Sequence, residues 1–265
     1  MIIQCTEKDR EMLVSFLEKD PVYNTFILAD IEDMGFDSSV QTVYAEVEEG
    51  ECVGVYLCFY KNLLISCEEN RTNVDFLEQL FGMFLPDVVM GKPETVRVAG
   101  WLLTDYRFGT KGFYALEDDS CLEEVSAKME TARAEDAQEI FRFIQRIPEI
   151  ADMYTSEKMI EDRIRDGLGV HYVIRENGAI VSHGNSAAES SGTVMIGGIA
   201  TAPECRGRRL AGQIVSRLSR DIIAKGKTPC LISLQGEEHN LYARLGFKRI
   251  GDWAMLTNGG KKNEC

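Results

Sequence analysis

The chain has 265 residues, of which 45% are hydrophobic, and its formal net charge is −14, from 43 acidic and 29 basic side chains. This length and composition indicate one large or two small globular domains and exclude a disordered chain. The negative charge opposes binding of nucleic acid or an anionic membrane over the general surface. No apolar run is long enough to span a membrane and no secretory leader is found, so we expect a soluble cytoplasmic protein.

An internal similarity relates the two halves of the chain. Residues 6–17 align with residues 133–144, and both segments predict an acidic turn followed by an amphipathic helix. Residues 44–53 align with residues 172–181, and both predict a hairpin that turns at a glycine. The matched pairs in the first alignment include Asp9 with Asp136, Leu13 with Ile140, and Phe16 with Phe143. The sequence therefore predicts two similar α/β units in tandem.

The acidic, polar stretch at residues 117–121 predicts a linker between the two units. We accordingly expect an N-terminal domain at residues 1–122 and a second domain at residues 123–257. Residues 258–265 are rich in Gly, Lys and Asn and predict a flexible tail.

The second half contains a strand, a turn, a helix and another strand in succession. Residues 193–200 are nearly all apolar or small, and apolar residues recur at helical spacing from Leu210 to Ile223. Lys225 and Gly226 then predict the helix end, and residues 229–234 form a second apolar run. This order predicts a parallel strand pair joined by a right-handed crossover, with a ligand site at the carboxyl end of the first strand.

The turn between the first strand and the helix suits an anion. Glycine lets neighbouring backbone amides converge, the helix start adds unpaired N–H groups, and arginines stand at positions 206, 208 and 209. A P-loop is unlikely on chemical grounds, since Gln213 and Ile214 occupy the positions where it requires Lys and Ser or Thr. No Gly-x-Gly-x-x-Gly string occurs here, which argues against a dinucleotide site.

The segment from Thr201 to Ala211 resembles the acyl-CoA-binding motif of the GNAT N-acetyltransferase superfamily, Arg/Gln-x-x-Gly-x-Gly/Ala, with Arg206 first and Ala211 last. Residues 240–247 resemble the second signature of that family, a short helix with a tyrosine before Leu-Gly-Phe. The resemblance covers residues 128–257 well. It implies a mixed α/β sheet of GNAT type in the C-terminal half, preceded by a degenerate copy.

The resemblance also implies site residues. Backbone groups of Gly198, Ile199 and Ala200 would hold the pantetheine arm of acetyl-CoA, and Tyr242 would be the general acid for the departing thiolate. The remaining positions implied to bind the cofactor are Thr201, Arg206, Gly207, Arg208, Arg209, Leu210, Ala211, Gly212, His239 and Asn240.

Arg209 departs from the family pattern, which has glycine there. Either the backbone is helical at this position and the guanidinium assists the phosphates, or the loop is altered and CoA binding is weakened. We favour the first, because a residue in the first helical turn does not need a positive φ. The general base stays open among Glu149, Asp152, His183, Glu189, Glu237 and Glu238.

The N-terminal copy is expected not to bind CoA, since residues 68–73 lack glycine and place carboxylates where phosphate would lie. The 8 cysteines form no Cys-x-x-Cys pair, so neither zinc nor a disulfide framework is predicted. We expect no metal, acetyl-CoA as co-substrate, and a monomer or homodimer.

These features predict an acetyl-CoA-dependent N-acetyltransferase that transfers acetyl directly to a primary amine of a small molecule. Two alternatives stay open: a non-catalytic CoA-binding sensor or regulatory protein, and an amino-acid N-acyltransferase that uses a longer acyl-CoA.

Overall fold

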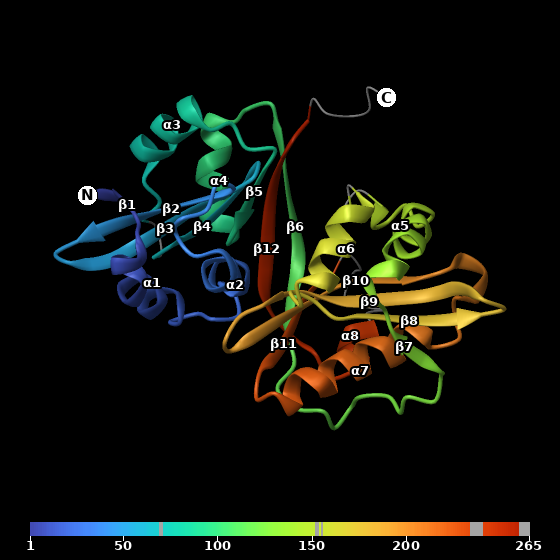
Figure 1. Ribbon diagram of the computed structural model, residues 1–265. Helices are drawn as coiled ribbons and strands as arrows, with labels where there is room; N and C mark the ends of the chain where they lie inside the picture. The colour runs from blue at the N-terminus through green and yellow to red at the C-terminus, as the bar shows by residue number, and fades with distance from the viewer. Residues whose placement is uncertain (69–70, 152–153, 155, 234–240, 260–265) are drawn as a thin grey trace. The chain divides into compact units, whose positions relative to one another are not determined.

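The computed structural model describes residues 1–68, 71–151, 154, 156–233 and 241–259 (Figure 1). The chain divides into two compact units, one from Met1 to Phe113 with the segment from Gly251 onward, and one from Tyr114 to Ile250. None of the helices in these described ranges combines the length and apolar character needed to cross a membrane.

Unit 1 contains a mixed sheet in the order β1-β2-β3-β4-β5-β12, in which only β4 and β5 run parallel. Its elements are β1 (Ile2–Gln4), η1 (Glu7–Asp9), α1 (Arg10–Leu17), α2 (Thr25–Met34), β2 (Gln41–Glu48), β3 (Glu51–Phe59), β4 (Asn62–Cys67), α3 (Val74–Met83), β5 (Val88–Gly91), α4 (Pro93–Leu102), β6 (Tyr106–Ala115) and β12 (Lys248–Asn258).

Unit 2 repeats this pattern in the order β7-β8-β9-β10-β11, and only β10 and β11 run parallel. Its elements are β7 (Met129–Thr131), η2 (Ala134–Asp136), α5 (Ala137–Gln145), α6 (Glu157–Arg165), β8 (His171–Glu176), β9 (Ala179–Glu189), β10 (Thr193–Thr201), η4 (Pro203–Cys205), α7 (Leu210–Ala224), β11 (Thr228–Ser233) and α8 (Leu241–Arg244).

The internal similarity of the two halves is confirmed in detail. At the start of the first helix of each half, an aspartate accepts a hydrogen bond from the backbone N–H three residues earlier: Thr6 to Asp9 and Arg133 to Asp136, both at 2.8 Å. The matched apolar positions are all buried, and they are Leu13, Phe16, Ile140 and Phe143. The same local chemistry therefore builds the same helix entry twice.

The two predicted hairpins also share one turn geometry. The central residues have φ values of 51° and 91° at Glu49 and Gly50, and of 50° and 82° at Asn177 and Gly178. Positive φ at both central residues is the property of a type I′ turn, whose twist matches the strands that it joins.

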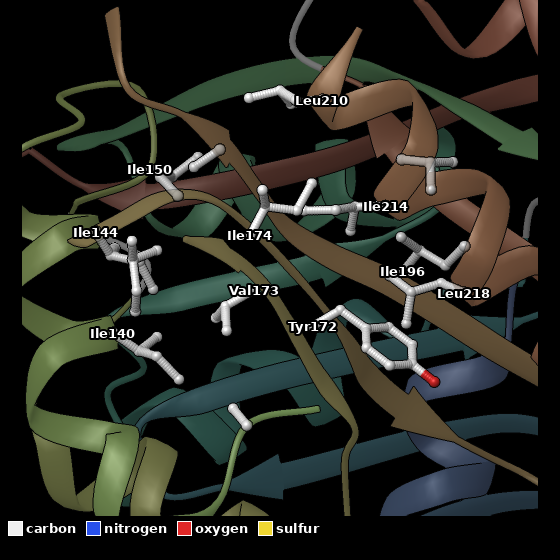
Figure 2. Packing of buried hydrophobic residues seen from close by; sticks show 14 of the residues in the cluster. Ile140, Ile144, Ile150, Tyr172, Val173, Ile174, Ile196, Leu210, Ile214 and Leu218 are labelled. Atoms are coloured by element: carbon white, nitrogen blue, oxygen red, sulfur yellow. The ribbon is translucent and has the colours of Figure 1, made fainter. Parts of the chain in front are cut away.

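Helices cover both faces of the unit 2 sheet. In Figure 2, Ile140 and Ile144 of α5 lie on one side of the strands, and Ile214 and Leu218 of α7 lie on the other. A Cβ atom at Gly184 of β9 would collide with Ile214, so this position faces α7. Because side chains alternate along a strand, the neighbours His183 and Asn185 face the side of α5 and α6.

Each unit also takes up chain from beyond its own half of the sequence. Residues 254–257 of β12, at the carboxyl end of the chain, pair with residues 88–91 of β5 in unit 1. In unit 2, the N–H of Leu116 donates to the carbonyl of Pro229 in β11. The predicted domain boundary between residues 122 and 123 therefore remains a proposal about where one repeat ends and the next begins. The compact units have other boundaries, between residues 113 and 114 and between residues 250 and 251.

Candidate functional site

The parallel strands β10 and β11 pair for only part of their length. Their register runs from Thr193 opposite Thr228 to Ile196 opposite Leu231. Beyond this point β10 continues to Thr201 and β11 continues to Ser233 without further pairing among the described residues. The carboxyl half of β10 therefore presents a free backbone edge on its β11 side.

A β-bulge lies where β10 leaves β11. Gly197 is opposite Asn185 of β9, but the next paired residue, Ala200, is opposite His183, so β10 holds one extra residue there. Gly198 lies in this bulge with φ at 59°, a left-handed conformation that favours glycine. The bulge sets the direction of the strand that follows.

Backbone groups beyond the bulge alternate between the two edges of β10. Ala202 donates its N–H to Val181, and the carbonyl of Ala200 accepts from the Ser182 hydroxyl at 2.9 Å, so both residues point toward β9. Ile199 and Thr201 consequently point toward the free edge. The Thr201 carbonyl accepts from Arg206 Nε at 3.3 Å, and in the described register of β10 Ile199 pairs with no residue of β9 or β11.

The turn after β10 carries unsatisfied amides into α7. Gly207 has φ at 78° and open space where a Cβ atom would stand. Gln213 is the first residue of α7 whose N–H bonds back to the preceding turn, to the Arg209 carbonyl. Within the described ranges, the N–H groups from Gly207 to Gly212 have no acceptor, as expected at a helix start. This cluster of donors suits an anion.

Our expectation for the backbone of Arg209 is wrong. This residue is the N-cap of α7 and has φ at 60° and ψ at 16°, which is left-handed and not helical. An L side chain costs about 1–2 kcal/mol in this conformation, whereas glycine adopts it freely. The glycine of the family pattern therefore has a steric reason, and Arg209 fills the position under strain.

The arginines around the turn differ in their partners. Arg206 donates to Glu149 at 3.0 Å, and Arg208 donates to Glu176 at 2.9 Å. Both pairs are about half exposed and contribute little to stability. Arg209 has no ion pair among the described residues, so its charge is available at the mouth of the turn.

Gly212 and Gln213, in the first turn of α7, pack against residues 123–127. The side chain of Gln213 is buried and its Oε1 accepts from the N–H groups of Ser126 and Ala127, at 2.9 and 2.7 Å. A Cβ atom at Gly212 would lie 2.5 Å from a carboxylate oxygen of Glu123. Sequence reasoning gave no role to Glu123, because no local pattern places residue 123 against residue 212.

Tyr242 lies in the short helix α8, which falls within residues 240–247, the segment that resembles the second family signature. Its ring contacts Phe247 edge to face, with ring centroids 6.1 Å apart. Burial raises the pKa of Tyr242 to about 12, so the phenol holds its proton throughout the physiological range. His239 and Asn240, the other residues expected here, lie outside the described residues, as do Asp152, Glu237 and Glu238.

Each described candidate for the general base already takes part in an ion pair or a hydrogen bond. Glu149 pairs with Arg206, and Glu189 accepts from Lys225 and Lys227 at 3.0 and 2.9 Å. His183 is fully buried, and its Nδ1 lies 2.8 Å from the carbonyl oxygen of Gly198. No group of potential metal ligands is found within the described part of the chain.

The corresponding turn in unit 1, between β4 and α3, differs in how its helix start is satisfied. The Asn73 side chain caps α3 by accepting from the N–H of Phe76 at 2.9 Å, so a helix donor is satisfied internally. Arg71 pairs with Glu48 and Glu68 on the same side. A capped helix start beside carboxylates leaves little affinity for phosphate.

Comparisons with known proteins agree with this arrangement. Residues 167–249 match a family model described as an acetyltransferase (GNAT) domain. No curated protein matches the chain.

Three solved structures illustrate the similarity. An acetyltransferase of the GNAT family from Colwellia psychrerythraea is 13% identical, with a TM-score of 0.56 over 97% of this chain and 98% of that one. A tandem GNAT protein from the clavulanic acid biosynthesis pathway is 12% identical, with a TM-score of 0.60 over 99% of both. A GCN5-related N-acetyltransferase-like protein from Streptococcus suis is 15% identical, with a TM-score of 0.58 over 93% of this chain and 99% of that one. At such identities the likeness shows the fold.

The left-handed conformation of Arg209 yields a stability prediction. Arg209→Gly should raise the free energy of unfolding by about 0.5–1 kcal/mol, because relief of the strained φ outweighs the added flexibility of the unfolded chain. Arg208→Gly is the control, since Arg208 has no positive φ and should lose stability. Urea denaturation measures both. An Arg209→Gly variant less stable than the wild type would contradict the assigned backbone.

Acid should destabilise the fold through two buried histidines. Burial lowers the pKa of His171 to about 2 and that of His183 to about 4. Both rings are then neutral in the folded state but become charged below about pH 6.5 when the chain unfolds. The free energy of unfolding is therefore independent of these rings well above this pH and falls as the pH drops below it, by up to about 1.4 kcal/mol per pH unit for each ring.

Urea denaturation at intervals from pH 7 to pH 5 measures this slope. His171→Phe should flatten it by about one proton's contribution. A wild-type stability that stays constant over this range would show that the two rings are not held neutral.

Proposed function

We propose that the protein is an N-acetyltransferase that moves acetyl from acetyl-CoA directly to a primary amine of a small molecule. Residues 167–249 match the GNAT acetyltransferase domain model, and the fold is similar to that of a tandem GNAT protein. One observation carries the proposal. Among the described residues, a strand that loses its partner at a bulge leads within a few residues into a helix start whose amides have no acceptor. An extended ligand with a diphosphate at one end matches both features.

The turn and the helix start would hold the diphosphate. The N–H groups from Gly207 to Gly212 supply donors and the helix dipole adds partial positive charge. Arg209, the N-cap of α7, has no ion pair within the described ranges and adds a positive charge to this turn. The attraction for the diphosphate is confined to this turn, because the chain as a whole carries a charge of −14. The positive charge of Arg209 therefore counters a field that would otherwise repel the ligand.

The free edge of β10 would orient the reactive end. Acetyl-CoA supplies a thioester whose carbonyl must be held against the amine. Ile199 offers a backbone N–H donor and a carbonyl acceptor at this edge. These are the groups through which a neighbouring strand would bind, and the extended ligand can use them in the same way. The carbonyls of Gly198 and Ala200 accept hydrogen bonds from residues of β9. We therefore assign the hydrogen bonds to acetyl-CoA at this edge mainly to the backbone of Ile199.

Tyr242 would act as the general acid. During transfer the amine loses a proton, a C–N bond forms, the C–S bond breaks and the sulfur gains a proton. A phenol with a pKa of about 12 stays protonated at neutral pH. It can donate to a thiolate, whose conjugate acid has a pKa of about 8.5.

We assign acetyl-CoA binding to residues 123–257 alone. Residues 1–122 are proposed to be a repeat that has lost this role, a view supported by the capped start of α3 and by its neighbouring carboxylates.

A turnover assay tests the function. The intact chain is incubated with acetyl-CoA and a panel of small primary amines, and thiol release is followed with and without each amine. Amine-dependent release supports the enzyme. Thermal stabilisation by CoA without thiol release under any amine would instead favour the sensor. Release only with longer acyl-CoA donors would favour the amino-acid acyltransferase.

Gly207→Glu should weaken acetyl-CoA binding by about tenfold or more, equivalent to about 1.4 kcal/mol, because a carboxylate would stand at the diphosphate. Gly226→Glu is a matched control at the other end of α7. Gly226 has a similar φ, 74° against 78°, and both positions have open space. Calorimetric titration measures both affinities, and equal losses would place the diphosphate elsewhere.

Tyr242→Phe should lower kcat by roughly ten- to a thousandfold and leave acetyl-CoA affinity nearly unchanged, since only the proton donor is removed. Tyr172→Phe is the control: the Tyr172 hydroxyl donates to Asp221 on α7, away from the free strand edge. Steady-state kinetics with a reactive amine provide the measurement. An unchanged kcat in Tyr242→Phe would remove Tyr242 from the mechanism.

A further inference from the structure

Four buried polar side chains converge on the bulge at Gly198. Tyr154, His171, His183 and Asn185 are exposed by 7%, 1%, 0% and 2%. A Cβ atom at Gly198 would lie 2.3 Å from Asn185 Oδ1, 2.4 Å from the Tyr154 hydroxyl and 3.1 Å from the His183 ring. These groups leave room only for glycine at this position.

The hydrogen bonds of the histidines form a chain with one direction. The Gly198 carbonyl can only accept, so His183 must donate to it from a protonated Nδ1, at 2.8 Å. Nε2 of the neutral His183 ring is then an acceptor. It lies 2.9 Å from Nδ1 of His171, which must therefore carry a proton as well. Both rings are fixed as the Nδ1–H tautomer.

This chain ends at an unsatisfied atom. Nε2 of His171 is buried and has no hydrogen-bond partner among the described residues. Burial, then the neighbouring His183 and then Arg163 of α6 lower the pKa of His171 and so oppose its protonation. Arg163 donates to the carbonyls of Leu168 and Ala187 at 2.7 and 2.6 Å. A buried acceptor without a donor costs stability, so the pair is poorly explained as a stabilising device.

The second polar pair supports the bulge from the same side. The Tyr154 hydroxyl donates to Asn185 Oδ1 at 2.8 Å, and Asn185 Nδ2 donates to the Ser186 carbonyl at 3.1 Å. The Asn185 side chain is thereby held against Gly198. With His183 bonding the Gly198 carbonyl, the bulge is fixed on two sides.

We infer that His183 is a positioning residue for acetyl transfer: it ties the Gly198 carbonyl toward β9 and so turns the backbone of Ile199 to the free edge of β10. His171 holds the His183 ring in the tautomer that this bond requires. The inference rests on the proposed function, because the free edge matters through the thioester that it would orient. Without the bond from His183, the Gly198 carbonyl could rotate and displace Ile199.

Two variants of one residue test this role. His183→Leu removes the donor to Gly198, whereas His183→Asn keeps an N–H donor close to the position of Nδ1. His183→Leu should lower kcat by about 10²-fold, the size of effect that a misplacement of about 1 Å can have. The KM for acetyl-CoA should change less, because the diphosphate grip lies beyond Thr201. His183→Asn should recover most of the lost kcat. Equal activities in the two variants would overturn the inference.

A spectroscopic test on the unmodified chain does not depend on activity or on the folding of a variant. The sequence has 3 histidines, so long-range proton–nitrogen correlation spectra of the imidazoles are simple to assign. The inference requires an Nδ1–H tautomer for both His171 and His183 at neutral pH. An Nε2–H tautomer at His183 would overturn it. If the wild type neither binds nor uses acetyl-CoA while both rings are Nδ1–H, the proposed function fails and the assigned hydrogen-bond chain stands.

Discussion

The separation of two parallel strands is the constraint on which this site depends. Parallel strands normally satisfy each other's backbone groups along their shared length, but β10 and β11 stop pairing after Ile196 and Leu231. The bulge adds one residue to β10 at this point, and the chain then enters α7 with its first amides unpaired among the described residues. The bulge thus lies beside a free strand edge, and this edge lies a few residues before a helix start. The cost of unsatisfied backbone groups is tolerable where a ligand or water reaches them.

The comparison of the two halves shows how a shared fold can differ in its chemistry. Both have the same strand order and the same helix entry, with Asp9 and Asp136 in equivalent bonds. In the second half the turn before α7 contains glycine and arginine; in the first half Asn73 caps α3 and acidic side chains lie nearby. The scaffold is retained, while the proposed anion site depends on a few residues in one turn.

Much of this arrangement could be predicted from the sequence because it rests on local signals. Helical periodicity, the paired aspartates and the glycine turns are all confirmed. The left-handed backbone of Arg209 could not be predicted, since its residue type favours a helical φ and the loop overrides that preference. The burial of Gln213 and the packing of Glu123 against Gly212 depend on contacts between distant segments. The bond between His183 and Gly198 likewise requires the strand register, which the sequence does not specify.

The most direct test of the account is an amide nitrogen–proton NMR titration of the labelled chain with acetyl-CoA. The account predicts the largest shifts at the amides of Gly207 to Gly212 and at Ile199, with the start of α3 near Asn73 unchanged. Shifts concentrated at α3, or absent from the turn before α7 while the ligand binds, would contradict the assignment of the diphosphate to these amides.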